Sequence, residues 1–142
     1  MDNTNTRLKK FIEKYHIETR IVNGNECLVM YKAVRWDFGS WYYRDRPEYD
    51  MGAYKPGTVV KCNKYDRSTH MDCGEGLHVG SLRFANSFRR AFCDPVNRMR
   101  IVEVLVYPRD VVCVPSASLI MRNEGKVRCK KLIVLRTIPR KR

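Results

Sequence analysis

Apolar side chains near the N-terminus recur at helical spacing. Four of them follow one another at positions i, i+3, i+4 and i+7: Leu8, Phe11, Ile12 and Tyr15. Because lysines occupy positions between them, the pattern predicts an amphipathic helix over residues 6–16. Two β-rich runs follow, residues 17–22 and 26–34, with Asn23-Gly24 between them. An Asn-Gly pair between such runs predicts a β-hairpin.

A second helical pattern lies in the middle of the chain, after Ser81. Its apolar positions are Leu82, Ala85, Phe88 and Phe92, and Asp94-Pro95 follows them. We therefore expect a helix over about residues 82–92, capped by the Ser81 hydroxyl. Residues 100–107 are, after Arg100, apolar on both faces except at Glu103, which predicts an interior strand that Pro108 terminates.

Four shorter β-rich segments complete the pattern: residues 58–61, 77–79, 110–114 and 127–135. Together the elements predict a single α+β domain over residues 1–142, with a mixed or antiparallel sheet, an N-terminal helix and one central helix. Residues 6–34 form its N-terminal helix and hairpin, and residues 136–142 its basic C-terminal tail.

Charge adds a functional expectation to this fold. The chain has 142 residues, with 28 Lys and Arg against 15 Asp and Glu, for a formal charge of +13. Residues 120–142 alone carry 9 basic groups and 1 acidic group. Such a charge favours phosphate-rich or acidic partners, so we expect a nucleic acid, DNA or RNA, first and a protein second.

Two stretches hold the side chains that we expect to contact nucleic acid. In the first, Trp41 and Tyr43 stack on bases and Arg44 and Arg46 bind phosphates, while Trp36 and Tyr42 belong to the core. The second is the C-terminal set of cations: Arg128, Lys130, Lys131, Arg136, Arg140, Lys141 and Arg142. No apolar run is long enough to span a membrane and no signal peptide is visible, so we expect the protein in the cytoplasm.

Several side chains are candidates for metal or catalytic chemistry. Zinc ligation by Cys62, His70, Cys73 and His78 is an alternative to a role in packing, because their spacing matches no common zinc module. The six cysteines are expected to be reduced thiols.

His78 and Glu103 stand out by their positions. His78 follows a turn with two glycines, which makes it a candidate for ligand contact, with a structural histidine as the alternative. Glu103 needs a cationic partner inside its apolar strand, and we expect Arg35, Arg83 or Arg100 to supply it. General acid or base chemistry is the alternative role of Glu103.

Five segments together resemble a known family. They are residues 28–35, 55–60, 73–81, 101–115 and 126–129, and they include Cys73-Gly74-Glu75-Gly76-Leu77-His78 and Tyr107-Pro108-Arg109-Asp110-Val111-Val112. In this order they resemble the C-terminal domain of the rapid-lysis protein B family of T4-like phages, over about residues 28–135. The resemblance implies an accessory protein that acts during phage infection, in the cytoplasm of the host cell, and it makes the second expected partner a host or prophage protein. It implies no particular chemistry.

The order of elements is also similar to that of ADP-ribosyltransferases of the poly-ADP-ribose polymerase type. This similarity implies a nicotinamide site near Tyr31 and His78. The chain departs from that pattern, because Tyr31-Lys32 replaces a His-Gly pair and no carboxylate stands near Arg128-Cys129, where the family has its catalytic glutamate. We therefore expect a binding module without a cofactor, and an NAD-binding enzyme with His78, Tyr31 and Glu103 as catalytic candidates is the alternative.

Overall fold

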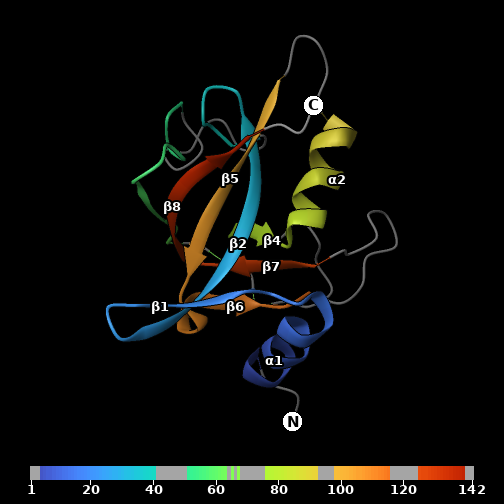
Figure 1. The fold of residues 1–142 in the computed structure, drawn as a ribbon, viewed down its shortest axis with the longest axis vertical. Coiled ribbons are helices and arrows are strands. Elements are labelled where there is room, and N and C mark those ends of the chain that lie inside the picture. The colour runs from blue at the N-terminus through green and yellow to red at the C-terminus, as the bar shows by residue number, and fades with distance from the viewer. Residues whose placement is uncertain are drawn as a thin grey trace.

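The computed structural model describes residues 4–40, 51–63, 65, 67, 76–92, 98–115 and 125–139. It contains helices α1 (Thr4–Tyr15) and α2 (Leu82–Phe92) and a sheet of eight strands (Figure 1). The strands are β1 (Thr19–Val22), β2 (Asn25–Arg35), β3 (Val59–Lys61), β4 (Leu77–Gly80), β5 (Met99–Val106), β6 (Val111–Cys113), β7 (Lys126–Cys129) and β8 (Lys131–Ile138). Among the described residues, neither helix is long and apolar enough to cross a membrane.

The sheet has the strand order β3-β8-β5-β2-β4-β7-β6, β1 pairs with β2, and all the pairs are antiparallel. The predicted α+β class with an N-terminal and a central helix is confirmed. Residues 127–135 were expected to form one strand, and that expectation is wrong. The chain there makes two strands, β7 and β8, which are separated by Lys130 alone and lie in different parts of the sheet.

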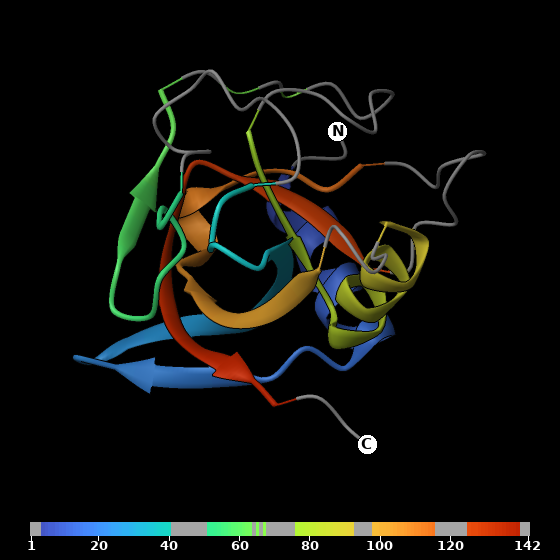
Figure 2. The ribbon, with the colours of Figure 1, turned by 90° about the horizontal axis from the view of Figure 1, so that it is seen from above.

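Lys130 is also the point at which the two ends of the sheet meet. Its carbonyl accepts the Cys62 N–H at 3.0 Å, directly after β3, and its own N–H donates to the Asp110 carbonyl at 2.9 Å, directly before β6. Because β3 and β6 are the two ends of the strand order, the sheet is rolled upon itself. Figure 2 shows the strands curving around a common centre.

The main core lies inside this roll. Alternate residues of β2 point inward, and Leu28, Met30 and Val34 are completely buried there. Leu8 and Phe11 of α1 belong to the same core. A smaller cluster on the outer face of the sheet is centred on buried Cys27, Val29 and Leu105.

The hairpin and the central helix begin as predicted. Asn23 and Gly24 both have positive φ, 51° and 78°, as the two-residue hairpin turn requires. The Ser81 hydroxyl accepts the Phe84 N–H at 3.1 Å and caps α2. The helix buries Phe84 and Ala85, whereas Leu82, which the spacing placed on the apolar face, is exposed.

Candidate nucleic-acid interface

The described residues cover only part of the predicted site. Nine of the predicted residues lie outside them: Trp41, Tyr43, Arg44, Arg46, Arg140, Lys141, Arg142, His70 and Cys73. The structure therefore places four of the predicted nucleic-acid contacts, Arg128, Lys130, Lys131 and Arg136, and these four do not share one surface.

Arg128 was expected to contact phosphates, and the structure corrects this. The side chain is 0% exposed, because β7 is an interior strand between β4 and β6. Its Nη2 donates to the Cys113 sulfur at 3.2 Å. A guanidinium at this depth is not available to a phosphate in solution.

Lys131 begins β8, next to the edge strand β3, where its Cα is the partner of Lys61. The two lysines make this part of the sheet positive, and like charges directly opposite each other repel. Arg136 lies farther along β8, and its Nε donates to Glu103 Oε2 at 2.8 Å. The positive charge of Arg136 is thus partly neutralised by the Glu103 carboxylate.

Trp36 is exposed, against the expectation that it belongs to the core. Its side chain stands 53% exposed, directly after the end of β2. The inward–outward alternation of side chains holds only within β2, which ends at Arg35. Trp36 lies in the turn that follows, so the alternation does not direct its side chain into the core. The Trp36 N–H donates to the Arg98 carbonyl at 2.9 Å, so Trp36 lies beside the start of β5.

Two arginines lie beside the Trp36 backbone, Arg98 directly before β5 and Arg100 within it. Arg100 Nε donates to the Trp36 carbonyl at 2.9 Å, and its guanidinium lies 5.0 Å from the centre of the Phe38 ring. Arg98 and Arg100 are both exposed. We call Trp36, Arg98 and Arg100 the basic end.

No carboxylate among the described residues forms an ion pair with Arg98 or Arg100. The nearest acid in sequence to Trp36 is Asp37, and it is already engaged. Its Oδ1 accepts Arg35 Nε at 3.1 Å and the Gly39 N–H at 3.0 Å. Among the described residues, no carboxylate therefore neutralises the two exposed guanidinium groups.

The basic end gathers parts of the chain that are far apart in sequence. Ile138 at the end of β8 is the partner of Ile101 in β5, three residues after Arg98. The Gly52 N–H donates to the Asp37 carbonyl at 2.8 Å. The C-terminal end of β8 and the residues that flank segment 41–50 thus reach the same end of the sheet, at the top of Figure 1.

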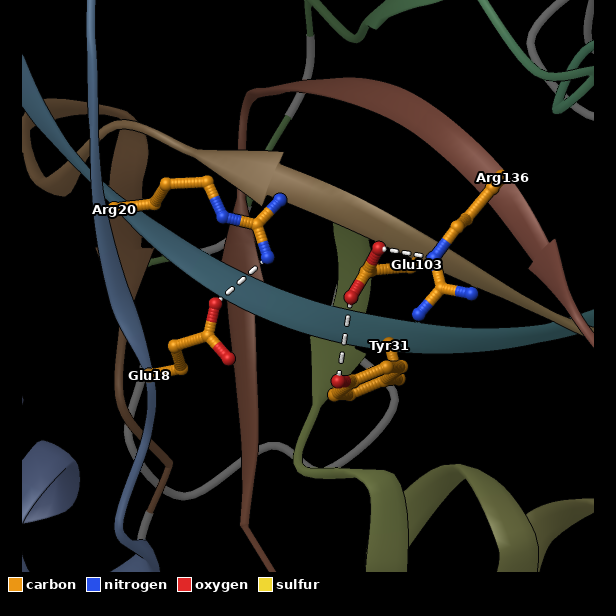
Figure 3. A network of polar contacts seen from close by, with 5 residues as sticks. All are labelled: Glu18, Arg20, Tyr31, Glu103 and Arg136. Carbon is orange, nitrogen blue, oxygen red and sulfur yellow. Dashed lines mark hydrogen bonds and ion pairs between the residues drawn. The ribbon is translucent and has the colours of Figure 1, made fainter.

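Two of the three catalytic candidates lie side by side on the outer face of the sheet (Figure 3). Tyr31 and Glu103 are partners across β2 and β5, and the Tyr31 hydroxyl donates to Glu103 Oε1 at 3.5 Å. Burial and, next, the Glu103 charge raise the pKa of Tyr31. Arg136, and none of the expected Arg35, Arg83 and Arg100, supplies the cation that Glu103 needs.

This network is arranged as a structural ion pair. Glu103 is only 4% exposed, and the hydrogen bond to its carboxylate raises the pKa of Arg136. The hydrogen bond from Arg136 holds this carboxylate in place, which suits it to stabilise the sheet. His78 is half-buried on β4, two residues from Gly80, the partner of Tyr31, so alternation places His78 and Tyr31 on the same face.

The interior of the roll contains a buried lysine that the sequence did not indicate. Lys32 Nζ donates to the His78 carbonyl at 2.8 Å and lies 5.2 Å from the centre of the Tyr54 ring. Burial lowers the pKa of Lys32 to about 8. Burial also raises the pKa of the Cys129 thiol to about 12, so this thiol stays protonated.

The described part of the zinc set does not converge. Cys62 belongs to the interior core, where its thiol lies 3.7 Å from the Cys129 carbonyl. Leu77 and Val79, the neighbours of His78 on β4, also point into this core, so strand alternation points the His78 side chain to the opposite, outer face of the sheet. Within the described ranges, no three His, Cys, Asp or Glu side chains come together as a metal site would need.

Comparisons with protein-family models, with curated proteins and with solved structures give no match to this chain. The functional inference therefore depends on the fold and on the surface that the fold creates.

Proposed function

We propose that this protein is a small basic module that binds nucleic acid through the basic end. The observation that supports this function best is an exposed indole on Trp36, whose backbone is hydrogen-bonded to two exposed arginines, Arg98 and Arg100. Neither arginine has a carboxylate partner among the described residues. Arginines bind phosphates, and aromatic rings stack on bases.

The distribution of acidic groups supports the same end of the molecule. The exposed carboxylates among the described residues are Glu13, Glu18 and Glu26. They lie on α1, just before β1 and at the start of β2, which is the lower part of Figure 1, whereas the basic end is at its top. A polyanion that approaches the protein is therefore drawn toward Arg98 and Arg100.

The resemblance to the rapid-lysis protein B family adds a context to this proposal. In that context the module acts during phage infection, on host or viral nucleic acid. A host or prophage protein is the second partner that we consider, and a measurement of oligonucleotide binding separates the two.

Binding of fluorescently labelled oligonucleotides, measured by anisotropy over a series of salt concentrations, tests the function. The logarithm of the affinity should fall linearly with the logarithm of the salt concentration. The double variant Arg98→Gln/Arg100→Gln should bind more weakly and with a shallower slope. For a single strand, the slope should decrease by about 0.7 for each phosphate that the variant no longer neutralises.

Lys9→Gln/Lys10→Gln is the matched control, because it removes the same number of charges from the exposed side of α1. Its salt slope should stay close to that of the unchanged protein. An equal effect of the two double variants would show that binding follows total charge and not the basic end. Failure of every oligonucleotide to bind at low salt would overturn the proposal and favour a protein partner.

The NAD-binding alternative gives a separate result. A thermal shift with NAD or ADP-ribose that is abolished in His78→Ala would favour the enzyme, since ligand binding stabilises the folded state. We expect no such shift.

A further inference from the structure

We propose that the ligand of the basic end is single-stranded nucleic acid, with one unpaired base stacked on Trp36 and adjacent phosphates bound by Arg98 and Arg100. This inference rests on the proposed function and specifies its substrate class. Three observations support it: the exposure of Trp36, the spacing of Arg98 and Arg100, and the hydrogen bond that orients the Arg100 side chain.

The exposure of Trp36 argues for an unpaired base. An indole that is half in water offers a flat apolar surface, and a base that stacks on it removes both surfaces from water. In a duplex the base faces are already stacked on their neighbours, so they are not available to a side chain at the end of a sheet. An unpaired strand exposes these faces.

The two arginines are placed to follow a strand. Arg98 directly precedes β5, and its carbonyl accepts the Trp36 N–H, so the extended pairing continues to it. In extended backbone, residues two apart lie on the same face with their Cα atoms about 6.8 Å apart, which places Arg98 and Arg100 side by side. This separation is close to that of neighbouring phosphates along an extended strand. The cations therefore match successive backbone groups of one strand.

Arg100 is partly ordered before any ligand arrives. Its Nε is bonded to the Trp36 carbonyl, and one face of its guanidinium lies over Phe38. Only Nε takes part in that bond, which leaves the Nη groups for a phosphate. A side chain that is already oriented loses less conformational entropy when it binds.

Helix α2 is the alternative surface, and it would suit a duplex. Arg83 and Arg90 are exposed and seven residues apart, so they lie on one side of the helix, as the contacts of a helix in a major groove do. However, Arg90 already uses Nη2 in a 3.4 Å hydrogen bond to the Ser87 hydroxyl, whereas Arg100 uses only Nε. Neither of the aromatic side chains that the structure describes on α2, Phe84 and Phe88, is exposed. The described features of the basic end therefore favour the single strand.

Tryptophan fluorescence tests the stacking directly. The chain has two tryptophans, and Trp41→Phe leaves Trp36 as the sole one while keeping an aromatic ring at position 41. Addition of a single-stranded oligonucleotide of about 16 nucleotides should quench the Trp36 emission, whereas a duplex of the same sequence should quench it much less. Binding of the single strand without quenching would exclude stacking on Trp36.

Affinity measurements on the full chain test the choice of ligand. Trp36→Leu should weaken the single-strand affinity by about tenfold and leave the salt slope unchanged, because the indole contributes stacking and no charge. Arg98→Gln/Arg100→Gln should instead reduce the slope. Trp36 is exposed, so Trp36→Leu should fold normally, and an unchanged melting temperature checks this.

Arg83→Gln/Arg90→Gln separates the two binding modes. We expect it to reduce single-strand affinity less than Arg98→Gln/Arg100→Gln does. Tighter binding of duplex than of single strand, with the larger decrease in Arg83→Gln/Arg90→Gln, would overturn the inference while leaving nucleic-acid binding intact. Absence of all nucleic-acid binding would instead overturn the proposed function itself.

Discussion

Glu103 and Arg136 meet at 2.8 Å because β8 contains one extra residue opposite β5. The register changes from Val104↔Val134 to Glu103↔Arg136, so Leu135 is the extra residue of a β-bulge. Without the bulge, strict alternation would point Arg136 to the same side as Val134, into the core. The bulge turns Arg136 to the outer face, where the Glu103 carboxylate lies.

We expect Arg136→Gln to destabilise the fold, because it leaves the nearly buried Glu103 carboxylate without its cation. Glu103→Gln/Arg136→Gln should be more stable than Arg136→Gln, since the uncompensated charge is gone. Urea unfolding measures both. Arg20→Gln is the control, as its partner Glu18 lies in water and the pair is exposed, so little change is expected. A double variant as unstable as Arg136→Gln would contradict the ion-pair explanation.

Stability should rise with pH as Lys32 loses its proton. The pKa of Lys32 is about 8 in the folded protein and 10.5 as the ordinary value. Between these values the unfolded chain binds more protons, so the free energy of unfolding increases with pH. The burial cost of the charged form is fully present below pH 8. The increase through Lys32 between pH 8 and pH 9 should be about 1 kcal/mol, since one pKa unit corresponds to about 1.4 kcal/mol and Lys32 is already half deprotonated at pH 8.

Lys32→Met removes this titration. The difference in free energy of unfolding between the unchanged protein and Lys32→Met should therefore change by about 1 kcal/mol between pH 8 and pH 9. The raised pKa of Cys129 acts in the opposite direction, but only above its ordinary value of 9.0. Measurements of urea unfolding up to pH 9 therefore isolate Lys32. Parallel pH profiles of the two proteins would show that Lys32 does not titrate in this range.

Gly80→Ala should destabilise the protein by about 1–3 kcal/mol, which is typical when a methyl group is forced into a packed position. The new Cβ would collide with the carbonyl of Gly125 and approach the Phe84 ring to 2.8 Å. The same Gly125 carbonyl accepts the Ser81 N–H at 2.8 Å, so the collision would disturb the start of α2. Circular dichroism during thermal unfolding measures the destabilisation, and an unchanged melting temperature would refute the close approach.

Lys61→Glu should stabilise the edge of the sheet by about 0.2–1 kcal/mol. The substitution replaces the repulsion between Lys61 and Lys131 with an attraction across β3 and β8. High salt should reduce the gain, because both groups lie near the surface. If the gain in thermal stability is independent of salt, charge is not its cause.

Local patterns predicted the elements whose stability depends on residues close in sequence. The Asn23-Gly24 turn and the Ser81 cap are confirmed, because a two-residue turn and a helix cap need only neighbouring groups. The interior position of β5 is also confirmed, since a strand that is apolar on both faces has to be covered on both.

The errors concern residues whose surroundings come from distant parts of the chain. Arg128 is charged and close to the basic C-terminus, yet the rolled sheet buries it between β4 and β6. Glu103 was correctly expected to need a cation, but only the bulge in β8 selects Arg136 as its partner. Neither the roll nor the bulge leaves a periodic signal in the sequence.

The sequence by itself therefore determined the class of fold, the helices, the hairpin and the large positive charge, because these follow from composition and from interactions between near neighbours. Only the tertiary structure decided which cations remain exposed and what lies beside them. Trp36 and Arg98 are 62 positions apart in the sequence, and the pairing of β2 with β5 brings them together at one end of the sheet. Strand register depends on the packing of the whole sheet, so the basic end appears only once the chain has folded.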